Sequence, residues 1–424
     1  MKVKLAYGKS GLIVDLPADR TTVIEPVYVE GLPDQKQAVV SALEAPIDSA
    51  PLAALVGKEK TVAVAVCDVT RPMPSHVVLP ELLRQLKDVP SEKITILVAT
   101  GTHRPSSQTE LAEMLGPGVL NEFRVVNHDA SDASGLEWCG KTSTGTPVWL
   151  NRRWLDADVR ITTGFAEPHF FAGFSGGPKL VAPGLAGLET ILSLHSAQLI
   201  GHPKSTWGII DENPLHTALR EIASSTGVTF GIDVTINRDR QITGVFAGEL
   251  FKEHEQACTV ARKNAMQPVS SPFDVVVTTN SGYPLDLNLY QSVKGMSAAA
   301  RIVVENGVIV CASECSDGIP RPGEYAEILA SGTSPKALLE MIDEPGYCRQ
   351  DQWQVQVQAM VQLKARVLLK SSSLTAEEVR AAHLEPVEDV GQTVKDELAA
   401  RGSESRVCVL PEGPQTIPYL SNAG

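Results

Sequence analysis

Apolar residues along the first half of the chain recur in strand-like runs, separated by stretches with helical periodicity. Short β-branched runs at 61–67, 93–100 and 123–128 predict strands, and amphipathic stretches at 75–86 and 106–115 predict helices. The alternation continues with strands at 156–165 and 228–236 and an apolar helix that opens at a glycine-rich turn and closes on His195. Strands that alternate with helices in this way are typical of parallel sheets with helices on both faces.

Around residues 264–274 the pattern lapses into proline and serine, and a strand at 274–282 restarts it. We therefore predict two α/β domains with mainly parallel sheets, over residues 1–268 and 273–424. Further strands are expected at 300–313 and 365–372, and helices at 334–342, at 350–363 and after Thr375, which has capping-box spacing to Glu378. The last strand, within 405–413, is compatible with either domain.

Composition and charge narrow the class of protein. The 424 residues carry a net charge of -13, which argues against nucleic acid as a partner, because such binding depends on clustered Lys and Arg. The sequence has no apolar run long enough to cross a membrane, and residues 1–17 resemble a short alternating strand rather than a signal peptide, so we expect a cytoplasmic protein. The seven cysteines are scattered and form no CxxC pair, which favours reduced, mostly buried thiols.

Chemistry-bearing residues follow the predicted strands, where ligands gather in parallel α/β sheets. Asp68 and Arg71 precede a helix whose N-terminus would suit a phosphate or carboxylate, although a capped turn with a solvated arginine fits equally well. His103 lies three residues beyond the end of the next strand, where a lone histidine is more often structural than catalytic.

The stretch 167–195 places His169, Lys179 and His195 around a glycine-rich turn. It is not a Walker loop, because the lysine is followed by Leu180 and not by a hydroxyl residue. Because Lys179 stands beside proline and apolar residues, its amine would be partly desolvated and therefore nucleophilic. The alternative is a surface lysine whose amine extends into solvent. His195 and His202 would lie about 10 Å apart along a continuous helix, too far to share one metal, so a buried core histidine remains the plain alternative.

A further polar group opens a predicted helix in the second domain. Tyr290, Gln291, Ser292 and Lys294 have spacing that would let them close over a substrate, although an ordinary polar first turn of a helix accounts for them as well.

Taken together, the motifs DVTRP (68–72), ATGTHRP (99–105), EPHFFAGFSGGPKLVAPG (167–184) with LH at 194–195, and LYQSVKG (289–295) resemble the lactate racemase family that depends on a nickel-pincer nucleotide. The resemblance implies a nickel pyridinium-3,5-bisthiocarboxylic acid mononucleotide attached covalently to Lys179. The cofactor would supply three donors to nickel, and His195 would be the protein's metal ligand.

The same resemblance implies roles for the remaining residues. The C2 hydrogen of a 2-hydroxy acid would move as hydride to the cofactor and return to either face, with His103 and His169 as acid and base for the hydroxyl. The active site is expected in the interdomain cleft. Substrate binding is assigned to Arg71, Tyr290, Gln291 and Lys294, with Trp353 nearby, and the cofactor phosphate region to Asp68 and Thr70.

The substrate is expected to be a small 2-hydroxy acid such as lactate or malate. Arg104, Arg152 and Arg153 are candidates for a second carboxylate. A sugar-acid epimerase of the same family is the nearest alternative, and a metal-dependent hydrolase or a nucleotide-binding protein would be of a different class. The resemblance also implies that cofactor-biosynthesis enzymes are partners and leaves homo-oligomer formation open.

Overall fold

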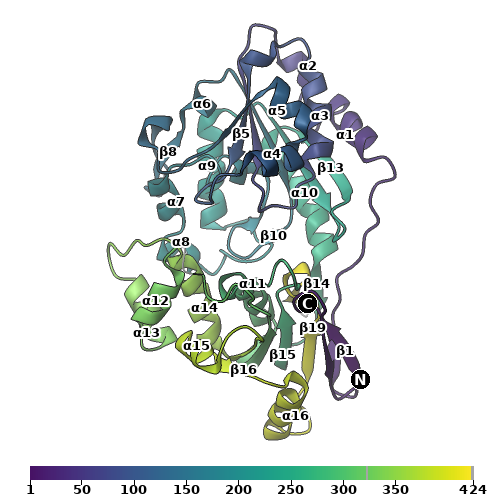
Figure 1. Ribbon diagram of the computed structural model, residues 1–424, viewed down its shortest axis with the longest axis vertical. Helices are drawn as coiled ribbons and strands as arrows, with labels where there is room; N and C mark the ends of the chain where they lie inside the picture. Colours follow the sequence, from purple (N-terminus) through teal and green to yellow (C-terminus); the bar gives the residue numbers. More distant parts are fainter. Residues whose placement is uncertain (321–322, 422–424) are drawn as a thin grey trace. The chain divides into compact units, whose positions relative to one another are not determined.

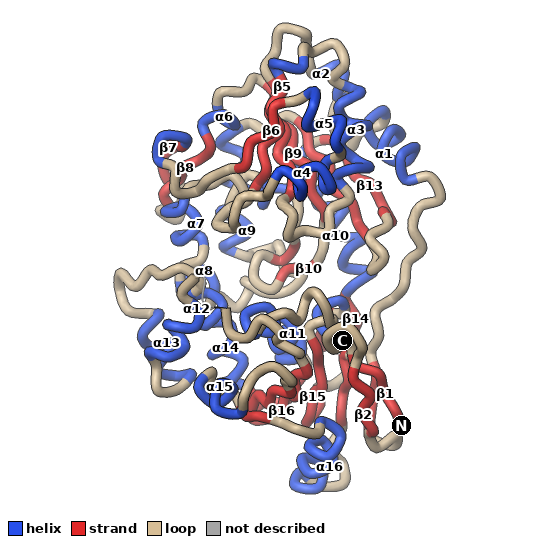
Figure 2. The backbone as a smooth tube through the Cα atoms, viewed as in Figure 1, coloured by secondary structure: helices blue, strands red, loops and turns tan. Residues whose placement is uncertain are grey.

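The computed structural model describes residues 1–320 and 323–421 (Figure 1). The chain divides into two compact units, which we call the middle unit (28–194 and 204–264) and the terminal unit (1–27, 195–203 and 265–424). Both are built from parallel sheets with helices along them (Figure 2), so the α/β fold class expected from the sequence is confirmed.

The middle unit is organised around a sheet with the order β13-β12-β9-β4-β5-β6. Neighbouring strands are parallel except for β12 and β13, which are antiparallel because only a short turn joins them. The expected strands are confirmed, whereas β13 was not anticipated. The bounds are β4 Val62–Cys67, β5 Ile94–Ala99, β6 Arg124–Asn127, β9 Val159–Phe165, β12 Phe230–Ile236 and β13 Ile242–Gly248.

Helices and short hairpins complete the middle unit. The expected helices at 75–86 and 106–115 are present, and the second has a full capping box between Ser107 and Glu110. The helices are α1 Gln35–Glu44, α2 Leu52–Leu55, α3 Ser75–Gln85, α4 Gln108–Leu115, α5 Pro117–Glu122, α6 Arg152–Leu155, α7 Leu188–Leu194, α9 Pro214–Thr226 and α10 Leu250–Ala265, with 3-10 turns η1 Ser91–Lys93, η2 Ala133–Gly135 and η3 Gly177–Leu180. The hairpins pair β7 Leu136–Lys141 with β8 Pro147–Asn151, and β10 Pro168–His169 with β11 Gly173–Phe174.

The helix expected to open at the glycine-rich turn and close on His195 is shorter than predicted. The turn opens only η3, and α7 begins later, at Leu188. Because α7 ends at Leu194, His195 lies outside it, in the link to α8 (Ala197–Ile200). Prolines at 178 and 183 favour the break, since proline in a helix interior removes a backbone N–H donor and crowds the preceding turn.

The terminal unit has a second parallel sheet with the order β18-β17-β16-β15-β19-β3. The last expected strand, whose place was left open, is β19 and lies between β15 and β3. Residues 266–269, expected to be irregular, form a strand that pairs with one near the C-terminus. The bounds are β3 Thr21–Val23, β14 Met266–Val269, β15 Phe273–Thr279, β16 Val303–Ala312, β17 Ala365–Lys370, β18 Glu385–Pro386, β19 Val407–Leu410 and β20 Ile417–Leu420.

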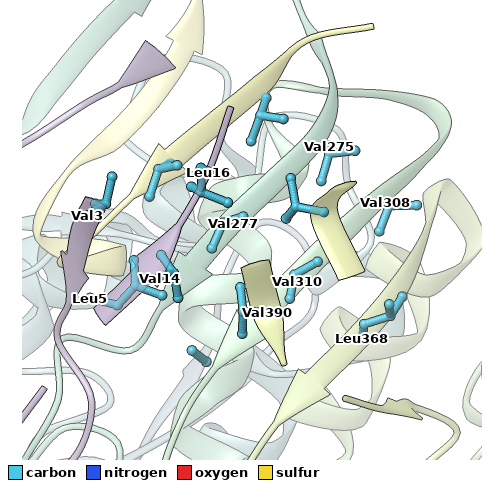
Figure 3. Packing of buried hydrophobic residues seen from close by; sticks show 14 of the residues in the cluster. Val3, Leu5, Val14, Leu16, Val275, Val277, Val308, Val310, Leu368 and Val390 are labelled. Carbon is cyan, nitrogen blue, oxygen red and sulfur yellow. The ribbon is translucent and has the colours of Figure 1, made fainter. Parts of the chain in front are cut away.

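The first residues of the chain form a hairpin, β1 (Lys2–Leu5) with β2 (Leu12–Asp15), rather than one strand. Alternate residues of the hairpin, such as Leu5 and Val14, are buried against Val277 of β15 and Val390 of α16 (Val390–Arg401), as Figure 3 shows. This packing, together with the pairing of β3 with β19, explains why residues 1–27 belong to the terminal unit, although the sequence placed them in the first domain.

The helix expected at 350–363 is α14 (Gln352–Lys364), and most of it is buried despite its glutamines. The amide nitrogens of two of these glutamines are hydrogen-bonded: Gln358 Nε2 donates to the Ala382 carbonyl at 2.8 Å and Gln356 Nε2 to the Ala197 carbonyl at 2.8 Å. These bonds offset the cost of burying polar groups. The other helical segments of the terminal unit are α11 Leu289–Ala300, α12 Tyr325–Ser331, α13 Pro335–Ile342, α15 Ala376–Ala381 and η4 Gly413–Gln415.

The membrane and cysteine expectations from the sequence concern the chain as a whole. Across residues 1–320 and 323–421, no helix combines the length and apolar character needed to span a bilayer. The cysteines are free thiols, of which Cys139 and Cys348 are exposed and the others buried, as the sequence predicted.

Candidate active site

Asp68 and His103 come together at the carboxyl edge of the middle unit's sheet. β4 and β5 are parallel neighbours, with Cys67 opposite Ala99, so the loops that follow them lie side by side. Asp68 Oδ2 lies 2.6 Å from His103 Nδ1. Asp68 Oδ1 accepts hydrogen bonds from the Thr70 backbone N–H at 3.0 Å and the Thr70 hydroxyl at 2.6 Å.

The Asp68 carboxylate favours one tautomer of His103. Burial alone would raise the pKa of Asp68, but the hydrogen bond and charge of His103, with Thr70 and Arg71, bring that pKa below its ordinary value. The carboxylate is therefore ionised near neutral pH and can only accept a hydrogen bond, so we assign the proton of neutral His103 to Nδ1. The lone pair of a neutral His103 consequently lies on Nε2, the nitrogen that faces away from Asp68.

Arg71 lies in the turn between β4 and α3, three residues beyond Asp68. Its side chain is exposed, and its backbone N–H donates to the Asp68 carbonyl at 3.1 Å. The residue before α3, Pro74, makes no side-chain capping bond. The closed turn thus fixes the Arg71 backbone near the sheet edge, and an exposed guanidinium is a group able to bind an anion.

His169 is placed by the hairpin of β10 and β11. Its ring packs edge-on to Phe171, with the ring centroids 4.5 Å apart, and lies against Phe170. The Ala172 backbone N–H donates to His169 Nδ1 at 3.2 Å. Since Nδ1 accepts a hydrogen bond, the proton of neutral His169 resides on Nε2, which is the opposite arrangement to His103.

Lys179 is half-buried on η3 and follows the sequence Gly176-Gly177-Pro178. Both glycines have positive φ, +81° and +47°, a region that other L-residues rarely adopt. The Lys179 backbone N–H donates to the Gly176 carbonyl at 3.1 Å, and its carbonyl accepts from the Gly184 N–H at 3.1 Å. The Gly177 N–H donates a hydrogen bond to Asp233 Oδ2 at 2.8 Å. Asp233 is buried, and the sequence motifs did not point to it.

The terminal unit holds the other candidate residues. His195 is buried, and its ring centroid lies 4.5 Å from that of Trp353 on α14. The Trp353 indole N–H donates to the Tyr290 hydroxyl at 3.1 Å. Contacts therefore link His195, Trp353 and Tyr290, which come from three separate segments of the sequence.

The first turn of α11 arranges Gln291 and Lys294. The Asn288 side chain caps the helix by accepting from the Gln291 backbone N–H at 3.0 Å. Lys294 Nζ donates to Gln291 Oε1 at 2.8 Å, across one helical turn. The polar helix start expected from the sequence is confirmed, and its amide and ammonium groups lie together.

The described residues do not offer a metal site built from protein side chains alone: over 1–320 and 323–421, no three His, Cys, Asp or Glu are placed to hold an ion. The middle unit thus contains an imidazole beside a buried carboxylate at a strand end, a second imidazole on a hairpin, and a lysine after a glycine turn. Imidazole and amine groups of this kind are able to transfer protons. Comparisons with known proteins make the class specific.

The family model of the lactate racemase N-terminal domain matches residues 7–208, and that of the lactate racemase C-terminal domain matches residues 269–417. The lactate racemase of Thermoanaerobacterium thermosaccharolyticum is 33% identical over 422 residues, which cover 98% of each chain. That of Lactiplantibacillus plantarum is 34% identical over 417 residues, covering 94% of this chain and 98% of the relative.

Solved structures point to the same family and fold. The lactate racemase apoprotein from T. thermosaccharolyticum superposes with a TM-score of 0.92 at 32% identity, over 99% of this chain and 100% of that one. A Thermotoga maritima protein shares the fold, with a TM-score of 0.69 at 19% identity over 93% of this chain and 100% of that one. The chain belongs to the lactate racemase family, and the protein is an isomerase of the racemase type.

Proposed function

We propose that this racemase interconverts the enantiomers of lactate or of a similarly small 2-hydroxy acid, with a nickel-pincer nucleotide attached to Lys179. Relatives named as lactate racemases, similar over nearly the whole chain, support the substrate class. The observation that carries the proton chemistry is the 2.6 Å contact between Asp68 and His103. Family membership favours this function over a metal-dependent hydrolase or a nucleotide-binding protein.

The residues present fit such a cofactor. Lys179 is held on a closed turn, which suits a covalent attachment, and His195 is a single buried imidazole beside Trp353. One imidazole is sufficient for nickel when the bound group brings its own sulfur and carbon donors. When bound, the cofactor supplies the acceptor for the C2 hydride, which avoids removing a weakly acidic proton from carbon.

His103 acts as the base toward the substrate hydroxyl in one direction. Its Nε2 lone pair accepts the hydroxyl proton, and the Asp68 carboxylate stabilises the imidazolium that results. His169 presents Nε2–H as a hydrogen-bond donor. To act as the base for the opposite enantiomer, its ring must release the Ala172 N–H. The two histidines thus exchange roles with the direction of the reaction.

Asp68 was expected near the cofactor phosphate together with Thr70. Its two oxygens are instead occupied by His103 and Thr70, and a carboxylate would repel a phosphate, so we assign Asp68 to orienting His103. The substrate carboxylate is assigned to Arg71 and Lys294, the latter held beside Gln291.

Tyr290 and Gln291 are proposed to orient the substrate, and Trp353 to fix both Tyr290 and His195 through the contacts described above. These aromatic and amide groups restrict rotation of the bound acid, which helps to present C2 to the cofactor in a reactive geometry.

The test uses protein produced together with cofactor-building enzymes. Intact-mass and peptide-mass measurements should find an adduct on Lys179, and Lys179→Ala should lose both the adduct and racemisation while keeping its melting temperature. Lys252→Ala, which alters an exposed lysine of α10, is the matched control and should behave as the unaltered protein. An adduct-free, fully active protein would refute the proposal.

The mechanism has its own test. With lactate labelled by deuterium at C2 and ordinary water as solvent, the product enantiomer should retain most of its deuterium. Loss of the label at every turnover would contradict hydride transfer. A panel of lactate, malate and sugar acids measures the substrate preference, and activity confined to sugar acids would favour the epimerase alternative.

A further inference from the structure

A buried polar cluster lies directly beneath the turn that carries Lys179. Asp233, in the middle of β12, is 1% exposed, and His254, on α10, is fully buried. Asp233 Oδ2 accepts from the Gly177 N–H at 2.8 Å and lies 2.6 Å from His254 Nδ1. The other ring nitrogen, His254 Nε2, is 3.3 Å from the Cys258 thiol.

The backbone of the turn lies so close to this pair that side chains are excluded. A Cβ atom at Gly176 would be 2.7 Å from the Asp233 carboxylate, and one at Gly177 would be 2.4 Å from the His254 ring. On the sheet side, a Cβ at Gly164 of β9 would come within 2.5 Å of Asp233 Oδ1. The carboxylate is therefore enclosed between the sheet and the turn. A shift of the carboxylate would force the backbone of the turn to shift with it.

The electrostatics of the cluster favour keeping Asp233 and His254 together. Burial by itself would lower the pKa of His254, but Cys258 and the Asp233 carboxylate raise it well above its ordinary value. Glu253, the neighbour of His254, is also buried; burial, followed by the negative charge of Asp233, raises its pKa well above the ordinary value. Because the His254 ring and the Asp233 carboxyl are both buried and lie 2.6 Å apart, separating them would leave buried polar groups without their partner.

We propose that Asp233 and His254 are positioning residues for Lys179: the pair holds the Gly176–Gly177 backbone so that the lysine amine meets the cofactor in a reactive geometry. The turn is closed on both sides of Lys179 by its bonds to Gly176 and Gly184, and Asp233 anchors it to the sheet. Displacement of a reacting group by about 1 Å can cost about a hundredfold in rate, so this anchor should control attachment. The inference rests on the proposed role of Lys179.

The first measurement needs no cofactor. Amide hydrogen exchange of peptides that contain residues 173–181 should become about tenfold faster or more in Asp233→Asn, because the charged acceptor of the Gly177 N–H is lost. Asp286→Asn is the matched control. Asp286 is also 1% exposed and accepts two backbone N–H groups, from Gly8 at 2.7 Å and Glu314 at 3.1 Å, but in the terminal unit.

The second measurement follows the mass of the Lys179 adduct during co-production with cofactor-building enzymes. Attachment in Asp233→Asn should be slower by about tenfold or more, whereas Asp286→Asn, at a similar melting temperature, should load normally. His254→Asn, whose amide nitrogen takes roughly the place of Nδ1, should restore more of the loading than His254→Leu does. This conservative rescue separates positioning from general stability.

The outcomes are distinct. Unchanged exchange of the turn in both Asp233→Asn and His254→Leu would overturn the inference, and so would equal losses of loading in Asp233→Asn and Asp286→Asn. If the unaltered protein never carries an adduct while the turn loosens as expected, the proposed cofactor attachment fails but the structural control of the Lys179 turn stands.

Discussion

Replacing Asp68 with asparagine tests the assignment of His103 as a base. The substitution preserves the size of the side chain, and its amide oxygen can still accept the hydrogen bonds of Thr70. The amide nitrogen then faces His103 Nδ1 at the site where Oδ2 now lies, 2.6 Å away. Because an amide N–H donates, Nδ1 must accept, and the proton of the imidazole moves to Nε2.

The size of the effect follows from this change of tautomer. With a proton already on Nε2, His103 no longer accepts the substrate hydroxyl proton at that atom, and the contribution of general base catalysis is lost. Such contributions amount to about 10²- to 10⁴-fold in rate. At about 1.4 kcal/mol per tenfold, the barrier rises by about 3–5 kcal/mol. We expect most of the loss in kcat, since the imidazole does not hold the substrate carboxylate in the proposed site.

The assay measures racemisation from each pure enantiomer by chiral chromatography, with the Lys179 adduct quantified by mass so that rates refer to loaded enzyme. Because the two enantiomers have equal free energies, kcat/KM must fall by the same factor in both directions. Asp158→Asn is the control: Asp158 also accepts an N–H, at 2.9 Å, and an O–H, at 3.0 Å, from one threonine, Thr61. It should leave the rate unchanged.

A fully loaded Asp68→Asn enzyme that retains kcat within about threefold would falsify the assignment, because the predicted change of tautomer removes a much larger factor. If the substitution lowered only the fraction of enzyme that carries the cofactor, and turnover per loaded molecule stayed normal, the result would instead support a role for Asp68 near the cofactor phosphate.

Three further predictions concern stability and substrate binding. Leu5→Ala, in the hairpin core, should lower the free energy of unfolding by about 2–5 kcal/mol in urea titrations, whereas the 67% exposed Ile13 of the same hairpin should tolerate alanine with a change below about 0.5 kcal/mol. Burial, followed by the charge of His254, lowers the pKa of His216 from the ordinary value of 6.5 to about 3 in the folded protein. As the pH falls below 6.5, the unfolded chain therefore binds a proton at His216 and the folded protein does not. Stability should therefore drop by about 2–3 kcal/mol between pH 7 and 4.5 in the unaltered protein, and by less in His216→Gln; equal acid slopes would contradict this. Trp353→Phe removes the hydrogen bond to Tyr290 and should raise KM for lactate about three- to tenfold, as steady-state kinetics would show, with an unchanged KM counting against the role of Tyr290.

Local patterns predicted the parallel strands well. A strand such as β4 is apolar at every position because both faces of the sheet are covered, and this run is visible in the sequence. The strands that were missed are of another kind. β13 includes glycines that weaken its pattern, and β14 includes Pro268 and depends on pairing with β20, about 150 residues later in the chain. Such strands are stabilised by partners that no local window contains.

The candidate site was predicted as a set of residue types rather than as a geometry. The motifs singled out His103, His169, Lys179 and His195, and the contacts with Asp68 and the Ala172 N–H lead us to assign opposite tautomers to the two first-named histidines. Asp233 was missed, although a charged residue within the apolar strand 230–236 was a signal that could have been used. Its importance depends on contact with Gly177, 56 residues away in the sequence.

The amino-acid sequence by itself determined the α/β class, the order of most strands and helices, and the residues able to perform acid-base chemistry, because hydrophobic periodicity and side-chain chemistry are properties of local segments. Tertiary structure alone decided that residues 1–27 complete the C-terminal sheet, that His195 contacts Trp353, and that a buried aspartate anchors the lysine turn. These features arise from contacts between residues distant in sequence, where burial and hydrogen bonding, rather than local propensity, set the free energy.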